Sequence, residues 1–313
     1  MAAPKIVTVG TVAIDTILTA KTKGQGERKE EVLGGSASYF AVAASGAASV
    51  GIVAAVGRDF PERHLAAFRR HKIATEGILR REDKTSFRWT GRYSPDFTRR
   101  ETLNVQLGIF DGYTPAVPES WRDAPAVFLA NGDPEHQLSV LAQMRRPKII
   151  VADSMNLWIE HKRPALEAVI RRAGGITLND EEARQLTGEH NLLRAARRIR
   201  RKGPRFVIIK KGEHGCLLDD AAGTTFVPAY PLEEVRDPTG AGDCFAGGLL
   251  GVLASEGDDS PGAVRRGLLA GTVWGSFAVE SVGPRRVLAA TSEDFRARLH
   301  ALKRMLRFAA DPA

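Results

Sequence analysis

The chain has 313 residues and a mass of 33.9 kDa, enough for one large α/β domain with a substantial hydrophobic core. Its hydrophobic share of 43% and charged share of 26% are those of a globular protein, and they exclude collagen, disordered chains and multi-pass membrane proteins. A net charge of +8 and a pI of about 9.7 indicate either a nucleic-acid partner or an anionic substrate on an arginine-rich background.

The two cysteines, Cys216 and Cys244, are too few for a secreted disulfide framework and lack the spacing of a metal site. The first residues run directly into a strand-like segment, without the charged start and apolar run of a signal peptide. We therefore expect a reducing, cytoplasmic setting.

Short apolar runs alternate with helical segments along the chain. Several runs are continuously apolar, which is typical of strands buried on both faces of a parallel sheet. The expected strands are residues 6–9, 50–56, 127–130, 149–152, 175–178 and 206–209. Polar residues follow four of them, at the sheet edge where open α/β folds bind ligands. These polar strand ends begin at Asn131, Asp153, Asn179 and Lys211.

The stretch 32–57 contains no charged residue and exceeds the length of a bilayer span. Five glycines and four serines interrupt it. We therefore expect a glycine loop, a helix of small residues and a buried strand there, and not a membrane helix.

Two segments, 15–33 and 84–113, carry alternating polar and aromatic residues in place of long apolar runs. The second predicts two strands joined by a turn at Ser94, Pro95 and Asp96. We interpret both segments as a small β lid inserted in a single domain that spans residues 1–313. A surface segment without a lid role fits the same pattern.

The most basic run is residues 197–202, Arg-Arg-Ile-Arg-Arg-Lys. Leu192, Leu193, Ala196 and Ile199 form an apolar stripe at helical spacing beside it. The run is therefore expected on the solvated face of an amphipathic helix, with a nucleic-acid patch as the alternative.

Residues 237–243, Asp-Pro-Thr-Gly-Ala-Gly-Asp, are the most informative segment. Small residues here open a helix whose free N–H groups and positive dipole end form an anion site. A carboxylate such as Asp243 is repulsive there unless it takes a proton from an attacking hydroxyl. No lysine follows as in a Walker loop, and Phe245 stands where a dinucleotide fingerprint needs glycine. A packed helix start with a capping aspartate is the alternative.

Residues 237–243 resemble in full the second signature of the PfkB, or ribokinase-like, carbohydrate and nucleoside kinases. Gly34 and Gly35 resemble the family's first, substrate-side signature, and the resemblance covers nearly the whole chain. It implies an α/β ribokinase-like fold, with a central, mostly parallel sheet flanked by helices and a small β lid. It also implies Asp243 as the general base and an anion hole formed by Gly240, Ala241, Gly242 and Asp243.

On the nucleotide side, Asn179 and Glu182 resemble the family's Asn-x-x-Glu motif, which implies Mg²⁺ held through water. A helix capping box gives the same pattern. Many relatives carry threonine at the position of Lys210. The nucleotide contacts that the resemblance implies are Asn179, Glu182, Lys210, Gly212, Gly215, Thr239 and Gly271, with residues 271–283 as the adenine-side wall. ATP, Mg²⁺ and a monovalent cation near Asp237 are the expected cofactors.

On the acceptor side, the resemblance assigns the hydroxyls of the substrate to Asp15, Gly34 and Gly35. A carboxylate offers several lone pairs to neighbouring hydroxyls, although Asp15 also fits a turn aspartate. Many sugar and nucleoside kinases have asparagine at the position of Tyr39. Tyr39 is therefore expected to supply a hydroxyl or an aromatic wall to the substrate.

We predict an ATP-dependent phosphotransferase that phosphorylates a hydroxyl of a sugar or polyol. A primary CH₂OH is the expected hydroxyl. A nucleoside is the alternative substrate, because Tyr39, Phe87, Trp89 and Tyr93 offer rings on which a base stacks. An ADP-dependent kinase of related fold agrees less well with Asn179 and Glu182.

A non-catalytic nucleotide-binding regulator with a basic nucleic-acid-binding surface is the alternative of a different class. Intact Asp243 argues against lost catalysis. As partners we expect a small-molecule substrate, no nucleic acid and no membrane, with a homodimer through the lid as in relatives.

Overall fold

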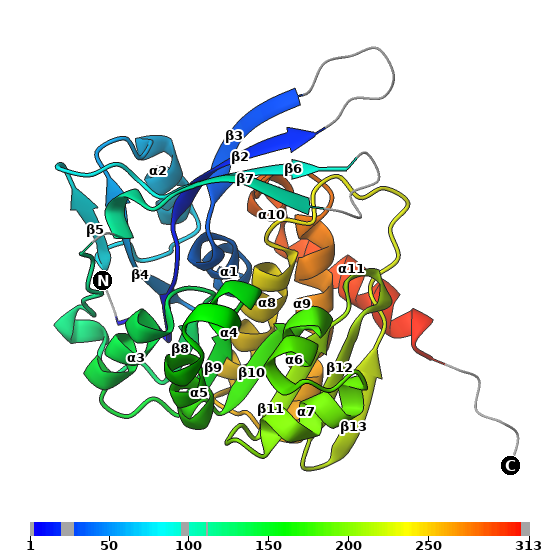
Figure 1. Ribbon diagram of the computed structural model, residues 1–313. Helices are drawn as coiled ribbons and strands as arrows, with labels where there is room; N and C mark the ends of the chain where they lie inside the picture. The colour runs from blue at the N-terminus through cyan, green and yellow to red at the C-terminus, as the bar shows by residue number, and fades with distance from the viewer. Residues whose placement is uncertain (1–2, 20–27, 95–99, 111, 308–313) are drawn as a thin grey trace, which may run out of the picture.

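The computed structural model describes residues 3–19, 28–94, 100–110 and 112–307. Within these ranges the strands form a nine-stranded sheet and a four-stranded sheet. The large sheet has the order β13-β12-β11-β10-β9-β8-β1-β4-β5, and helices cover both of its faces (Figure 1). This is the predicted α/β class with a central, mostly parallel sheet.

Seven strands of the large sheet run parallel to their neighbours, namely β1 (Ile6–Val9), β4 (Val50–Gly57), β5 (Ile78–Arg81), β8 (Ala126–Leu129), β9 (Ile149–Asp153), β10 (Gly175–Asn179) and β11 (Phe206–Lys210). All six predicted strands are confirmed to within a residue at each end. Strand β5 and the antiparallel hairpin of β12 (Cys216–Asp220) and β13 (Gly223–Val227) were not predicted. They lie at the two edges of the sheet, where exposed polar residues break the apolar signal.

The large sheet separates two hydrophobic cores. Along β8, Phe128 packs into one core and Val127 into the other, because successive side chains of a strand point to opposite faces. One core is completed chiefly by α1 (Ser36–Ser45), α8 (Ala241–Glu256), α9 (Pro261–Ala278), α10 (Arg285–Ala289) and α11 (Ser292–Met305). The other is completed by α3 (Pro134–Gln143), α4 (Asn156–His161), α5 (Arg163–Arg172), α6 (Asp180–Thr187) and α7 (Leu192–Arg200).

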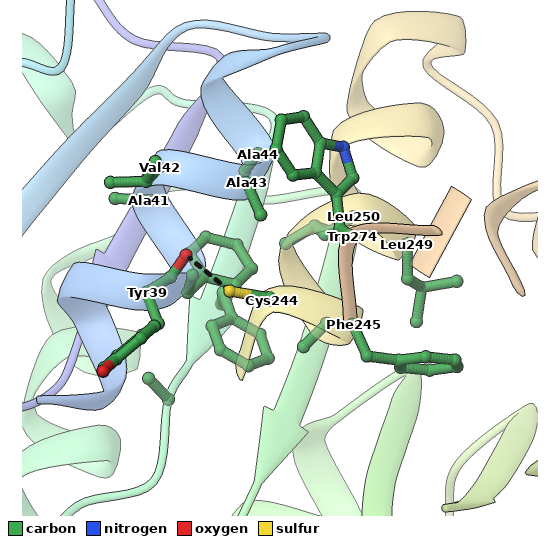
Figure 2. Close-up of a cluster of buried hydrophobic side chains, with 14 of the residues drawn as sticks. Tyr39, Ala41, Val42, Ala43, Ala44, Cys244, Phe245, Leu249, Leu250 and Trp274 are labelled. Atoms are coloured by element: carbon green, nitrogen blue, oxygen red, sulfur yellow. Dashed lines mark hydrogen bonds between the residues drawn. The ribbon is translucent and has the colours of Figure 1, made fainter. Parts of the chain in front are cut away.

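Helices α1 and α8 pack closely because small residues face each other. A Cβ on Gly247 would lie 2.5 Å from the carbonyl oxygen of Phe40, so only glycine permits this approach. Figure 2 shows the two helices side by side, joined by a hydrogen bond of 3.6 Å from the Cys244 thiol to the backbone carbonyl of Tyr39. The two helix starts are thereby held in fixed relative positions.

The uncharged stretch 32–57 forms the predicted loop, helix α1 and buried strand β4. Among the described residues, no helix combines the length and hydropathy needed to cross a membrane. The prediction against a membrane helix in this stretch is therefore confirmed.

The small sheet has the order β3-β2-β6-β7 and contains β2 (Ala13–Thr19), β3 (Arg28–Gly34), β6 (Arg88–Tyr93) and β7 (Arg100–Gln106). Both segments predicted to form a β element are confirmed as strands of this one sheet. Only three residues separate β1 from β2, so the small sheet rises directly from the carboxyl end of a central strand (Figure 1). The predicted turn at 95–96 lies outside the described residues.

Candidate active site

The start of α8 has the backbone of an anion site. Gly240 caps the helix in the left-handed conformation, with φ of +77°, and a Cβ there would lie 2.3 Å from the ring of Tyr39. Both conditions require glycine. The N–H of Ala241 donates to Pro238 at 3.3 Å, whereas the N–H groups of Gly242 and Asp243 point along the helix axis from its first turn. These groups and the helix dipole favour a bound anion.

Asp237 shapes the loop that leads into α8. Its buried carboxylate accepts hydrogen bonds from the N–H of Thr239 at 2.9 Å and the N–H of Gly283 at 3.0 Å. Burial raises its pKa. The carboxylate thus connects the signature to the segment predicted as the adenine-side wall, while the monovalent cation stays a prediction.

Asp243 lies half-buried at the first turn of α8. Burial, followed by the negative charge of Asp153, raises its pKa to about 8, and the ammonium of Lys210 opposes this rise. Asp15 and Glu182 add to the negative field. A carboxylate with a pKa near neutrality is suited to take a proton from a hydroxyl.

Lys210 is the last residue of β11, and its ammonium donates to the carboxylate of Asp153 at 2.8 Å. Asp153 is the last residue of β9 and had no predicted role. The sequence did contain a signal, because both residues end parallel strands at the sheet edge that binds ligands. The pairing itself depends on the strand order, in which β10 lies between them.

Asn179 and Glu182 form a complete capping box at the start of α6. The Asn179 side chain accepts from the Glu182 N–H at 2.7 Å, and the two Glu182 oxygens accept from the backbone and side-chain N–H groups of Asn179 at 2.7 and 2.8 Å. The capping alternative is therefore present.

Within the described ranges, no group of three or more His, Cys, Asp or Glu side chains is placed to hold a metal ion. Mg²⁺ does not require such a group, since it keeps several waters and binds through one or two carboxylates together with substrate phosphates. The buried carboxylates around Asp243 fit an ion of this kind. A role for Asn179 and Glu182 in organising it stays a prediction.

The loop after β11 is closely packed at Gly215 and open at Gly212. Gly215 has φ of +86°, and a Cβ there would lie 2.0 Å from the carbonyl oxygen of Val227. Gly212 has φ of +55°, yet nothing lies within 4 Å of its Cβ position. The backbone at Gly212 is thus accessible to a ligand, as the predicted nucleotide contact requires.

Gly271 lies inside α9, where a Cβ would be 2.6 Å from the carbonyl oxygen of Phe245. Close packing of α9 against α8 accounts for this glycine. The predicted contact of Gly271 with nucleotide stays a prediction.

Asp15 occupies β2 directly above the glycine pair. A Cβ on Gly34 would lie 2.0 Å from the Asp15 carboxyl carbon, so the glycine makes room for this side chain. Gly35 caps α1 with φ of +94°. Burial, followed by the charge of Asp237, raises the pKa of Asp15 to about 7, and the N–H of Gly35 opposes this. The structure thus brings Asp15, Gly34 and Gly35 together.

Tyr39 is 1% exposed and packs its ring against Gly240. The sequence pattern placed it on the acceptor side, and the structure adds a contact of the ring with Gly240 at the start of α8. The ring therefore fills the space beside the N-cap of α8. Direct contact of Tyr39 with an acceptor stays a prediction.

The other aromatic residues near this edge fall into two groups. Phe87, Phe110, Tyr113 and His136 form a cluster with ring centroids 5.3 to 6.3 Å apart. Trp89 instead packs on residues of the small sheet. The side chain of Tyr93 lies outside the described residues. The four-residue cluster, which sequence reasoning missed, is assembled from three separate segments.

Two of the polar residues that follow strands make contacts within the fold. The side-chain carbonyl of Asn131 accepts from the Trp158 indole at 3.0 Å, and its backbone carbonyl accepts from Ser36 at 2.7 Å. Asn156 donates to Gln185 at 2.8 Å. These contacts connect strand ends to neighbouring helices.

The basic run lies on α7, as predicted, and acidic residues partner much of it. Arg197 and Arg200 contact Asp219, and Arg198 contacts Glu189. The stripe is only partly buried, because Leu193 is 37% exposed. A shallow depression of about 370 Å³ is lined by Arg194, Arg197, Arg198, Arg201 and Glu189. This surface is formed by charged side chains.

The chain is similar to known proteins over nearly its whole length. Residues 3–288 match the model of the pfkB family carbohydrate kinases. A cytidine kinase from Thermococcus kodakarensis is 31% identical over 249 residues, 78% of this chain and 87% of that protein. A 2-dehydro-3-deoxygluconokinase from Escherichia coli K12 is 38% identical over 101 residues, 31% of this chain and 32% of that protein.

Among solved structures, a nucleoside kinase from Burkholderia thailandensis in complex with inosine superposes with a TM-score of 0.76 at 21% identity. The match covers 95% of this chain and 98% of the other. At this identity the likeness shows the fold, which is therefore ribokinase-like as expected.

Proposed function

Because the chain belongs to the pfkB family of carbohydrate kinases, we propose that it transfers the terminal phosphoryl group of ATP to a hydroxyl of a small polyhydroxylated acceptor. One observation carries this proposal. Asp243, a half-buried carboxylate whose pKa desolvation raises to about 8, stands at the first turn of a helix whose N-terminal N–H groups favour an anion.

In this proposal Asp15 accepts hydrogen bonds from hydroxyls of the acceptor, and Gly34 and Gly35 let the backbone approach it. Asp243 removes the proton as the hydroxyl attacks. The N–H groups of the Gly240–Asp243 turn stabilise negative charge on the transferring phosphoryl group. Mg²⁺, when bound, offsets the charge of the triphosphate. The small sheet, as a lid of a single kinase domain, excludes water from the acceptor side.

For the acceptor we favour a nucleoside, which reverses the preference that the sequence alone gave. A relative matched over 87% of its own length is a cytidine kinase. The aromatic cluster of Phe87, Phe110, Tyr113 and His136 offers a surface for a base. It lies near Asp15, since the carbonyl of Phe87 accepts from the N–H of Ile14 at 3.1 Å.

A sugar or polyol is the second candidate, and the match to a 2-dehydro-3-deoxygluconokinase favours it. A carboxylate such as Asp15 suits either acceptor, because both present hydroxyl groups. A panel of nucleosides, pentoses, hexoses and inositol, assayed for ATP consumption and for the phosphorylated product, separates the two. Turnover of cytidine or another nucleoside at the highest kcat/KM supports the first candidate. Highest turnover of a sugar supports the second, and none with any acceptor contradicts the proposal.

We also propose that the chain forms a homodimer through the lid. Strand β7 is an edge of the small sheet, where Leu103 and Val105 are 38% and 46% exposed, and Leu107, directly after the strand, is 61% exposed. An exposed apolar edge strand favours association. Val105→Lys is expected to convert a dimer to a monomer in sedimentation or light scattering, with Leu79→Lys, an exposed leucine of β5, as the control. A monomeric wild-type protein contradicts the proposal.

A further inference from the structure

Lys210 and Asp153 form an ion pair between two strands that are not neighbours in the sheet. Each is the last residue of its strand, and β10 lies between β9 and β11. The Nζ–Oδ2 distance is 2.8 Å, and the two side chains are 17% and 4% exposed. The alternation along β9 and β11 puts both residues on the sheet face that packs against α8.

The tip of Lys210 lies against the first turn of α8. A Cβ on Gly242 would lie 3.1 Å from its Nζ and 3.7 Å from its Cε, so the absence of a side chain at Gly242 leaves the lysine its space. The ammonium therefore lies beside the N–H groups proposed to receive the phosphoryl group. It is also close enough to Glu182 and Asp243 for both carboxylates to act on its charge.

The ammonium has more donors than the ion pair uses. A lysine carries three N–H donors, and Asp153 takes one of them. The flexible side chain would otherwise adopt many conformations, and the bond to Asp153 fixes its direction in advance. A lysine held in this way is a compact point charge of the kind that binds phosphate oxygens.

We propose that Asp153 is a positioning residue that holds the Lys210 ammonium over Gly242, so that Lys210 binds the terminal phosphate of ATP at the start of α8. This inference rests on the proposed function, because it assumes that α8 receives the phosphate chain. It gives Asp153 a role and explains how a lysine serves at a position where many relatives carry threonine. Lys210 contacts the reacting phosphate, and Asp153 acts through Lys210.

Calorimetric binding of MgATP and MgADP tests the proposal without turnover. Lys210→Met is expected to weaken MgATP binding about tenfold and MgADP binding less than about twofold, because only ATP carries the terminal phosphate. Asp153→Asn is expected to weaken MgATP binding about threefold. In the double variant the loss should equal that of Lys210→Met alone, since Asp153 has nothing left to position.

The matched control is Asp220→Asn. This change breaks a comparable pair, Arg265–Asp220 at 3.0 Å, whose aspartate side chain is 3% exposed. It should alter thermal stability as much as Asp153→Asn does, without changing the ratio of ATP to ADP affinity. A purely structural role for Asp153 predicts the same result for both variants. Equal losses for ATP and ADP, or additive losses in the double variant, would overturn the proposal.

Kinetics separate this inference from the proposed function. Lys210→Met should lower kcat about 100-fold, and Lys210→Arg, which keeps the charge, should restore part of it. Asp153→Asn should lower kcat without changing KM for the acceptor. If the wild type turns over no acceptor, the proposed function fails while the affinity ratio still tests Lys210. If Lys210→Met keeps wild-type kcat and ATP affinity, the inference about Lys210 fails, while the proposed kinase function is unaffected.

Discussion

The start of α8 and the basic surface of α7 were both candidates for contact with an anion, and they are built in opposite ways. The first turn of α8 consists of small residues and a half-buried carboxylate, and its N-cap is a left-handed glycine. The basic surface at α7 has acidic partners at Asp219 and Glu189. Its shallow depression is lined by four arginines, Arg194, Arg197, Arg198 and Arg201. The basic surface therefore presents charged side chains. The start of α8 presents backbone N–H groups, and the helix contains no basic residue.

The difference means that net charge does not locate the proposed anion site in this protein. At α8 the backbone supplies oriented N–H groups, and glycines let a ligand approach them. At α7 the long side chains extend into solvent, where screening weakens their charges. The +8 charge of the chain thus belongs mainly to its surface, and the proposed site contains more carboxylates than ammonium groups.

Removing the charge of Asp243 should have the largest effect. Asp243→Asn is expected to lower kcat by at least about 1000-fold while leaving ATP affinity within a few fold, because only proton removal is lost. Steady-state kinetics and calorimetry measure the two effects. Full activity in this variant would rule out Asp243 as the base.

The same variant should stabilise the fold at alkaline pH. Burial raises the pKa of Asp243 in the folded protein from 3.8 to about 8, so the stability that the protonated group contributes is lost as pH rises through this range. Asp243→Asn avoids this loss, and its Tm should exceed that of the wild type increasingly between pH 5 and about pH 8. A Tm difference independent of pH would contradict the raised pKa.

Distorting the backbone at the start of α8 should have the next largest effect. Gly240→Ala adds a Cβ 2.3 Å from the Tyr39 ring at a residue with φ of +77°. Gly257→Ala, at the other end of α8, meets the same backbone strain at φ of +66° but has nothing within 4 Å. The control should lose about 1–2 kcal/mol of stability and keep its activity. Gly240→Ala should lose more stability and at least about tenfold in kcat, since the N–H groups move. Equal effects of the two variants would remove the case for a specific anion site at the start of α8.

A smaller effect is expected from pH. The raised pKa of Asp243 means that the base is more often protonated at neutral pH than an ordinary aspartate, so kcat/KM should rise between pH 6 and about pH 9. Bound Mg²⁺ stabilises the carboxylate, and the kcat profile should therefore have its midpoint at lower pH. Residual activity of Asp243→Asn supplies the control and should be independent of pH. A wild-type rate that falls across this range would contradict the assignment.

The smallest effect is expected on α7. Neutralising Arg194 and Arg201 with glutamine should change kcat and ATP affinity by less than about twofold, because surface charges contribute little. Nucleic-acid binding, measured by anisotropy at two salt concentrations, should be weak in wild type and variant alike. Tight binding that falls steeply with salt and is lost in the variant would instead support a regulator with a basic surface.

Local sequence patterns predicted much of the fold and part of the site. Buried parallel strands were recognised because each is continuously apolar, and the start of α8 because only glycine fits its backbone. Strand β5 was missed because two of its four residues are arginines, and the β12–β13 hairpin because β13 is largely exposed. Edge strands carry a weaker apolar signal, so their prediction needs the neighbouring strand.

The sequence by itself identified three parts of the candidate site: the glycines of the α8 turn, the carboxylate of Asp243 and the glycine pair before α1. Each could be recognised because it depends on local backbone geometry or residue chemistry. Only the tertiary structure decided that Asp153 meets Lys210 across β10 and that Tyr39 supports Gly240. It also decided that burial and neighbouring charges raise the pKa of Asp243 and Asp15. These properties arise from residues distant in the chain, whose proximity depends on strand order and on the packing of α1 against α8.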